Sequence, residues 1–324
     1  GCQRFEAGAP DVARISGTTM GGAYTVKLVA PDQNLAAVRS AVQGALDAVD
    51  WRMSLFRPDS ELVAFNRARA GEPFALSDEM HRVFAAALAV SRQTDGAFDM
   101  TVAPLVERWG FGTSPTRRVP STTALVEARA RLGWQSLHLD EATRTVVKDR
   151  RDVQADLGGI AKGYGVDLAA RAIEAFGVEH YMIEVGGELR TQGRNAAGQP
   201  WQIGIEEPDA LPQRARRVVP LAGRAMATSG DYRIYFEQAG RRYSHEIDPR
   251  SAAPIAHGLA SVTVIAGDCM TADALATALI VLGPQAGWAL AQRETLAAYF
   301  IVRDADGRLH DRASDAFAAL TQAA

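Results

Sequence analysis

The chain has 324 residues, of which 47% are hydrophobic and 23% are charged, with a formal net charge of −3. This composition is ordinary for a globular protein with a sizeable core, and the charge balance gives no reason to expect a nucleic-acid partner. The only two cysteines, Cys2 and Cys269, exclude a disulfide framework, and Cys269 is expected to be a buried, inert thiol.

The chain begins with Gly1-Cys2 and continues irregularly to Pro10. This start is typical of a bacterial lipoprotein after removal of its signal segment; a cloning remnant with a chance cysteine is the alternative. We therefore expect residues 1–11 to be a tail and residues 12–324 to form a single domain. Because no run of 18 apolar residues occurs, membrane contact is expected only through a lipid on Cys2.

The first half of the chain predicts strands followed by amphipathic helices. Residues 12–30 have strand-like composition, interrupted at Gly21-Gly22. Apolar residues at three- and four-residue steps predict a helix from Leu35 to Met53. Further helices, each followed by a glycine, are predicted over residues 78–95, 122–132 and 159–176.

The second half predicts a series of strands that are mostly antiparallel. They are expected at residues 136–139, 145–148, 181–185, after 187, and at 201–206, 217–221, 233–238, 241–247, 260–266 and 296–302. Two helices are expected before the last strand, one capped by Thr271 and one starting at Pro284. Helices interleaved with such strands predict a mixed α+β fold without the βαβ repeat of a parallel sheet.

Asp273 and Thr277 are four residues apart in a predicted helix, so their oxygens lie on one face. A carboxylate and a hydroxyl in this relation can hold a hard cation together with backbone carbonyls. Because such pairs are common, simple capping by Asp273 and packing by Thr277 is the alternative.

Two other segments contain residues suited to phosphate chemistry. Glycines before a helix, among them Gly159, let the backbone come close to an anion, and the ammonium of Lys162 could reach the same anion. A plain strand-to-helix connection explains the segment equally well. Strand alternation would place His245 and Ile247 on one face. Histidine can accept a proton near neutral pH, but a single strand histidine is more often structural.

Three glycine-containing segments complete the candidates. Gly186-Gly187-Glu188 and residues 228–232 predict tight turns beside a cleft. Trp109–Gly112 offers aromatic surface that either contacts a flat ring or, as is commoner, packs in a core. Taken singly, none of these segments determines a function.

Taken together, the segments resemble the ApbE family of FAD:protein FMN transferases in their order and in their amino-acid sequences. The resemblance runs from about residue 14 to 302. Its blocks are residues 17–21, 53–56, 59–62, 96–99, 104–106, 109–112, 156–164, 186–188, 227–232, 243–250 and 273–277. It implies a mixed fold related to the tunnelling fold (T-fold) and supports a lipid-anchored Cys2, hence a periplasmic protein held at the inner membrane.

The resemblance also implies roles for particular residues. Mg²⁺ would be bound by Asp273, Thr277 and the backbone carbonyl of Gly159, and His245 would be the general base. The residues implied to contact FAD are Met20, Phe56, Ala97, Phe98, Asp99, Lys162 and His245.

The implied reaction moves FMN from FAD to a threonine or serine hydroxyl of an acceptor protein, such as a membrane redox subunit, and releases AMP. Two alternatives share these sites. One is an Mg²⁺-dependent FAD pyrophosphatase that yields free FMN and AMP, and the other is a non-catalytic FAD-binding lipoprotein.

The chain departs from the family pattern near the expected flavin pocket. Gly22 and Ala23 replace two hydroxyl residues, and Phe56 stands where tyrosine is frequent. Gly158-Gly159 replaces a Ser-Ala pair, which leaves a carbonyl ligand in place because that ligand needs no side chain.

Overall fold

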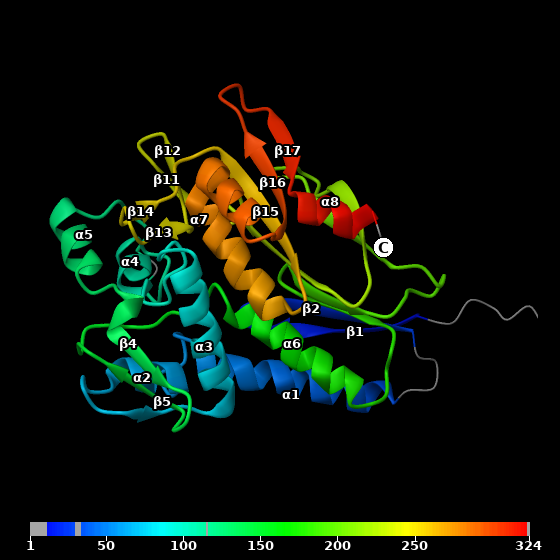
Figure 1. Cartoon of the computed structure of the whole chain (residues 1–324), viewed down its shortest axis with the longest axis horizontal. Coiled ribbons are helices and arrows are strands. Elements are labelled where there is room, and N and C mark those ends of the chain that lie inside the picture. The colour runs from blue at the N-terminus through cyan, green and yellow to red at the C-terminus, as the bar shows by residue number, and fades with distance from the viewer. Residues whose placement is uncertain (1–11, 30–33, 115, 323–324) are drawn as a thin grey trace, which may run out of the picture.

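The computed structural model describes residues 12–29, 34–114 and 116–322, so Cys2 and the expected tail lie outside the described residues. An eight-stranded sheet in the order β1-β2-β6-β7-β10-β15-β16-β17 forms its centre (Figure 1). Every pair of neighbours in this sheet is antiparallel. The predicted α+β class with mostly antiparallel sheets is confirmed.

The strands of the main sheet are β1 (Val12–Thr19), β2 (Gly22–Val29), β6 (Tyr181–Val185), β7 (Glu188–Gln192), β10 (Ala225–Gly230), β15 (Leu259–Ala266), β16 (Ala297–Arg303) and β17 (Leu309–Ala313). The smaller sheets contain β3 (Phe74–Ala75), β4 (Leu137–Asp140), β5 (Thr145–Lys148), β8 (Trp201–Glu206), β9 (Ala215–Leu221), β11 (Tyr235–Gln238), β12 (Arg241–Ser244), β13 (Ile247–Asp248) and β14 (Ala253–Pro254). The helices are α1 (Leu35–Met53), α2 (Glu61–Arg67), α3 (Asp78–Gln93), α4 (Ala103–Arg108), α5 (Thr122–Arg129), α6 (Ala161–Glu174), α7 (Cys269–Arg293) and α8 (Asp315–Gln322).

Helices α1, α6 and α7 cover one face of the sheet (Figure 1). Helix α6 packs on β6 and β7, and α7 packs on β10 and β15. The opposite face is covered by α8 and the β8–β9 hairpin, around an apolar core that includes Trp201, Tyr299 and Phe317. Of the elements between α1 and α6 in sequence, α2 packs on α1 and α3 packs on α7, at the left of Figure 1. Both faces are therefore buried at central strands such as β15, whereas one face of the edge strand β1 is exposed.

Helix α7 is long and apolar enough to cross a membrane, but 61% of its most apolar window is buried inside the fold, as in a core helix. It consists of two helices joined at Gly283 (φ 79°), directly before Pro284, where the sequence predicts a new helix. The predicted cap is wrong, because the side chain of Asp268 accepts the N–H of Thr271 and the helix starts at Cys269. Asp273 therefore lies in the second turn.

Several other elements differ from the expectation. Residues 228–230 are predicted as a turn but belong to β10, which pairs with both β7 and β15. The predicted strand over residues 241–247 is interrupted, because β12 ends at Ser244 and β13 begins at Ile247. His245 and Glu246 form a bend, in which His245 is half-buried and Glu246 is buried, so strict alternation fails there. Sequence patterns also do not predict α2, α4, β17 or α8.

Candidate active site

Helices α6 and α7 cross in close contact near their N-termini. A Cβ on Gly163 would lie 2.3 Å from the carbonyl oxygen of Cys269 and 2.8 Å from the Cβ of Asp273, so only glycine permits this approach. The Gly163 N–H donates to Oδ2 of Asp273 at 2.9 Å. Asp273 is 4% exposed. The backbone of α6 therefore fixes the position of this buried carboxylate.

Asp167, also on α6, holds the first turn of α7. Its carboxylate accepts the N–H groups of Cys269 and Met270 at 2.9 Å and the guanidinium of Arg190 at 2.9 Å. A carboxylate at this point satisfies free helix N–H groups and matches the positive end of the helix dipole. Burial raises the pKa of Asp167, and these hydrogen bonds oppose the rise. The predicted buried thiol at Cys269 is confirmed.

Three oxygen-bearing groups converge beside this crossing. Oγ1 of Thr277 lies 3.5 Å from the carbonyl oxygen of Gly159. A Cβ on Gly159 would lie 3.0 Å from that hydroxyl and 3.2 Å from the ring of Phe98. Asp273 is one turn before Thr277 on α7, and among the described residues its Oδ1 accepts no hydrogen bond. A carboxylate, a hydroxyl and a carbonyl are thus available on one side of the crossing.

Lys162, in the first turn of α6, pairs with a buried acid. Its Nζ lies 2.6 Å from Oε1 of Glu188, which starts β7 after the tight Gly186-Gly187 turn and is 3% exposed. Oε2 of Glu188 is buried without a hydrogen-bond partner among the described residues. Burial raises the pKa of Glu188 to about 7, Lys162 opposes this rise, and the charge of Asp273 adds to it. Burial lowers the pKa of Lys162, but Glu188 and Asp273 outweigh that effect and the net shift is upward.

His245 lies at the edge of the same charge cluster. Its Nδ1 is 3.1 Å from the carbonyl oxygen of Ile234, so a proton on Nδ1 leaves the Nε2 lone pair free. Nε2 is 3.6 Å from Oε1 of the buried Glu246. Burial raises the pKa of Glu246, His245 and Lys162 oppose this rise, and Asp273 adds to it. Glu246 therefore connects the histidine electrostatically to Lys162 and Asp273.

The aromatic segment from Trp109 to Gly112 packs within the protein. The ring of Trp109 stacks on Tyr243 with centroids 5.6 Å apart, and its Nε1 donates to the carbonyl of Ala252 at 3.1 Å. Phe111 meets the His245 ring edge-on at 6.3 Å. The core-packing interpretation holds for Trp109, and Phe111 supports the histidine from one side.

The other residues expected to contact FAD lie at different depths. Met20, at the β1–β2 turn (φ 45°), reaches α6, where its Cε would be 3.0 Å from a Cβ on Gly165. Ala97 is buried, and Asp99 accepts the N–H and hydroxyl of Thr101 at 2.7 and 2.6 Å. Phe56 is 72% exposed. Met20 and Phe98 therefore lie beside the α6 segment, whereas Phe56 stands on the surface.

Comparison with known proteins identifies the family of this chain. The profile of the ApbE family matches residues 20–300. The chain belongs to the ApbE family. A protein of Haemophilus influenzae named FAD:protein FMN transferase is 40% identical over 320 residues, which is 96% of this chain and 92% of that protein.

Solved ApbE structures have the same fold. The apo form of the Pseudomonas stutzeri flavinyl transferase ApbE superposes with a TM-score of 0.88 and 41% identity, covering 97% of this chain and 98% of that one. The flavin transferase ApbE of Vibrio cholerae gives a TM-score of 0.88 and 39% identity, covering 95% and 99%. The expected ApbE-like fold is confirmed.

Sequence reasoning misses three acidic residues of this ApbE chain. Glu188 is part of a recognised block but receives no role, Glu246 is overlooked beside His245, and Asp167 gives no signal at all. A buried acid on a strand or helix becomes visible only when its partner is known, here Lys162 for Glu188. The two glycines, both with positive φ, predict only the tight turn before β7 and not the burial of Glu188.

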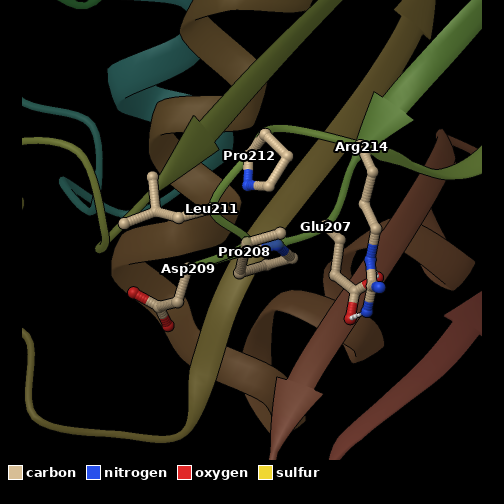
Figure 2. A pocket seen from close by; sticks show the side chains of 7 residues that line it. Glu207, Pro208, Asp209, Leu211, Pro212 and Arg214 are labelled. Atoms are coloured by element: carbon tan, nitrogen blue, oxygen red, sulfur yellow. Dashed lines mark hydrogen bonds and ion pairs between the residues drawn. The ribbon is translucent and has the colours of Figure 1, made fainter.

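Two grooves of this ApbE chain lie apart from the candidate residues. One, of about 580 Å³, runs between β1 and α1 and is lined in part by Tyr24, Arg39 and Asp47. The other, of about 410 Å³, is enclosed by the loop of residues 207–214 (Figure 2). Neither is lined by a residue expected to bind metal or FAD. The candidate residues are therefore brought together by hydrogen bonds and charge, and they do not line either groove.

Proposed function

We propose that this chain is an FAD:protein FMN transferase whose active site lies at the α6–α7 crossing. The observation that carries the proposal is the meeting of Lys162, Gly159 and Thr277 with the buried carboxylate of Asp273. These groups come from segments more than 100 residues apart in the chain. The proposal is supported by about 40% identity to proteins of that name over nearly the full chain.

In the proposed reaction, an acceptor hydroxyl oxygen attacks the phosphorus of the FMN half of FAD. A new oxygen–phosphorus bond forms, the bond to the AMP oxygen breaks, and AMP leaves. The hydroxyl proton passes to Nε2 of His245, which is free because Nδ1 faces the Ile234 carbonyl. A positioned base of this kind contributes roughly 10² to 10⁴ in rate.

The residues present fit Mg²⁺. Asp273, Thr277 and the Gly159 carbonyl would hold the ion, and all three offer the oxygen ligands that a hard cation prefers. No group of three or more His, Cys, Asp or Glu side chains suited to a metal occurs in the described part of the chain, so phosphate oxygens would complete the shell. When bound, Mg²⁺ supplies positive charge to the pyrophosphate and to the leaving AMP.

The charge of the cluster favours a divalent cation. When ionised, the buried carboxylates of Asp273, Glu188 and Glu246 share one ammonium, that of Lys162, which leaves an excess of two negative charges. Buried uncompensated charge is costly. A divalent ion held at Asp273 would offset this excess, which would favour the approach of an anionic substrate.

FAD is proposed to lie against the start of α6. The ammonium of Lys162 and the positive end of the α6 dipole attract its phosphates. Met20 and Phe98 flank the same segment. We extend the FAD site to Phe56, Ala97 and Asp99 from the family resemblance, with Phe56 contributing a ring where tyrosine is frequent.

The acceptor is proposed to be a threonine- or serine-bearing protein, such as a membrane redox subunit. Cys2 is proposed to carry a lipid that anchors the enzyme at the periplasmic side of the inner membrane. A lipid on the enzyme would bring it to the same surface as such an acceptor.

Incubation with FAD, MgCl₂ and the soluble domain of a flavinylated redox subunit tests the function. A mass gain of one FMN on the acceptor, with AMP in solution, is expected. Free FMN and AMP with an unmodified acceptor would instead identify a pyrophosphatase. FAD that remains intact would identify a binding protein.

A further inference from the structure

The loop of residues 207–214, between β8 and β9, presents an unusual apolar side chain. Leu211 is 93% exposed and stands between Pro208 and Pro212 on the rim of the 410 Å³ groove. Figure 2 shows Leu211 and Asp209 on one side of the loop and the Glu207–Arg214 pair on the other. The Glu207–Arg214 pair closes the base of the loop, so Leu211 is held out toward solvent.

Ion pairs join the loop to the segment that leads to His245. Asp209 lies 3.5 Å from Arg242 on β12 and 2.6 Å from Arg303 at the end of β16. Arg303 also reaches Asp231, directly after β10, at 3.3 Å. The side of the loop that carries Asp209 and Leu211 therefore borders residues 231–244.

That neighbouring segment continues directly to the proposed base. Ile234, whose carbonyl faces Nδ1 of His245, has a side chain that is 45% exposed. Arg233 pairs with Glu206 at the end of β8, immediately before the loop. A second exposed apolar side chain thus belongs to the residue whose backbone contacts the histidine, on the segment to which the loop is joined.

The reaction requires a second macromolecule at His245, because the attacking hydroxyl belongs to a protein. The groups proposed to hold FAD, Lys162, Gly159 and Phe98, belong to the α6 side of the site. Among the described residues, the loop and residues 231–236 make no contact with those groups through a hydrogen bond or ion pair. This leaves the loop side open to the acceptor.

We propose that Leu211, Asp209 and Ile234 form a docking surface for the acceptor protein. The occupant is a hydroxyl-bearing segment with an apolar side chain that covers Leu211 and Ile234 while its hydroxyl meets Nε2 of His245. A few anchor side chains carry most of the binding energy of an interface, so removal of an apolar anchor commonly weakens binding strongly. The inference rests on the proposed transferase function.

The variant Leu211→Asp tests the surface, with Leu35→Asp on α1 as its matched control. Both replace an exposed leucine, and the exposure of Leu211 means that folding is retained. Rates are measured against the redox-subunit domain at saturating FAD, and then against FAD at fixed acceptor. For Leu211→Asp we expect the KM for the acceptor to rise about tenfold and the KM for FAD to stay unchanged. Leu35→Asp should match the wild type in both.

Direct binding separates this inference from the transferase proposal. The labelled acceptor domain is titrated with wild-type protein and with each variant, with FAD and MgCl₂ absent. Tight binding by wild type and Leu35→Asp, with about tenfold weaker binding by Leu211→Asp, supports the docking surface even if no FMN is transferred. Equal acceptor binding by all three proteins, or no binding by wild type, overturns it.

Discussion

At the scale of single residues, the site depends on groups that are held before any substrate arrives. Lys162 is fixed by Glu188 at 2.6 Å, and Asp273 is fixed by the Gly163 N–H at 2.9 Å. His245 is oriented through the Ile234 carbonyl. Because these groups are already oriented, they need little reorganisation during the reaction. Such preorganisation is the main source of electrostatic catalysis.

His245→Ala should lower kcat for FMN transfer by roughly 10² to 10⁴, because the acceptor hydroxyl loses its base. FAD binding should persist, since Lys162 and the start of α6 are unchanged. His310→Ala, at an exposed histidine on β17, is the control and should keep full activity. Transfer by His245→Ala at the wild-type rate would remove the histidine from the mechanism.

Thr277→Val should raise the Mg²⁺ concentration needed for half-maximal activity by at least about tenfold, because the hydroxyl beside the Gly159 carbonyl is lost while the shape is kept. Thr277→Ser keeps the hydroxyl and should stay close to wild type. Titration of MgCl₂ in the transfer assay measures both. Equal metal requirements for the two variants would contradict the assignment of Thr277.

Glu188 should make stability depend on pH. Its pKa is raised from 4.5 to about 7, so the folded protein holds this proton more tightly than the unfolded chain does. The free energy of unfolding therefore falls as the pH rises from about 4.5 to 7 and is then level. The raised pKa of Lys162 changes stability only above pH 10.5.

Glu188→Gln should remove this fall. Between pH 4.5 and 7, the free energy of unfolding of this variant should rise relative to that of wild type by up to about 3 kcal/mol. Urea unfolding at pH 5 and pH 8, with EDTA present, measures the change. Parallel pH profiles for the two proteins would show that Glu188 does not titrate there.

At the scale of elements, the crossing of α6 and α7 determines whether the site can form. Gly163→Ala would place a Cβ 2.3 Å from the Cys269 carbonyl, and two helix backbones cannot both give way cheaply. We expect a loss of stability of roughly 1–3 kcal/mol and a loss of transfer as Asp273 moves.

Gly44→Ala on α1 is the matched control for this prediction. Nothing lies within 4 Å of an added Cβ there, so a stability gain of up to about 1 kcal/mol is expected, with unchanged activity. Thermal unfolding and the transfer assay measure both variants. A Gly163→Ala protein as stable as Gly44→Ala would show that the crossing tolerates a side chain.

Elements with regular apolar spacing could be predicted from the sequence, and others could not. Helix α1 follows the predicted bounds because Val38, Val42 and Leu46 repeat on one buried face. Strand β10 escapes prediction because Thr228-Ser229-Gly230 has turn-like composition and becomes a strand only through its partner β15. Long-range pairing overrides local preference at that point.

The candidate site was predictable only in part, for the same reason. Asp273 and Thr277 could be paired from their helical spacing, but their meeting with Gly159 and Lys162 depends on the α6–α7 crossing. The bend at His245 and Glu246 breaks the alternation that the sequence suggests. No local pattern places Glu188 against Lys162, because that contact joins a helix to a separate strand.

At the scale of the whole molecule, the proposed lipid on Cys2 should govern location and not chemistry. When both proteins are expressed behind the same bacterial lipoprotein signal segment, Cys2→Ser should appear in the soluble periplasmic fraction and the wild type in the membrane fraction. Its rate on a soluble acceptor domain should equal that of wild type, since every proposed site residue belongs to the region after residue 11. Membrane retention of Cys2→Ser would show that something other than this cysteine anchors the protein.

The central sheet consists of two groups of strands that meet at a narrow join. Strand β7 pairs with β10 only at Ala225↔Arg190 and Met226↔Leu189, whereas β10 pairs with β15 along its full length. Lys162 and Gly159 belong with the first group through α6, and Asp273 and Thr277 belong with the second through α7. A molecule bound by both helices therefore adds a further connection across this join, beside the direct contact of α6 with α7. Ligand binding should raise the melting temperature in proportion to the logarithm of ligand concentration, so the melting temperature reports the occupancy of the site.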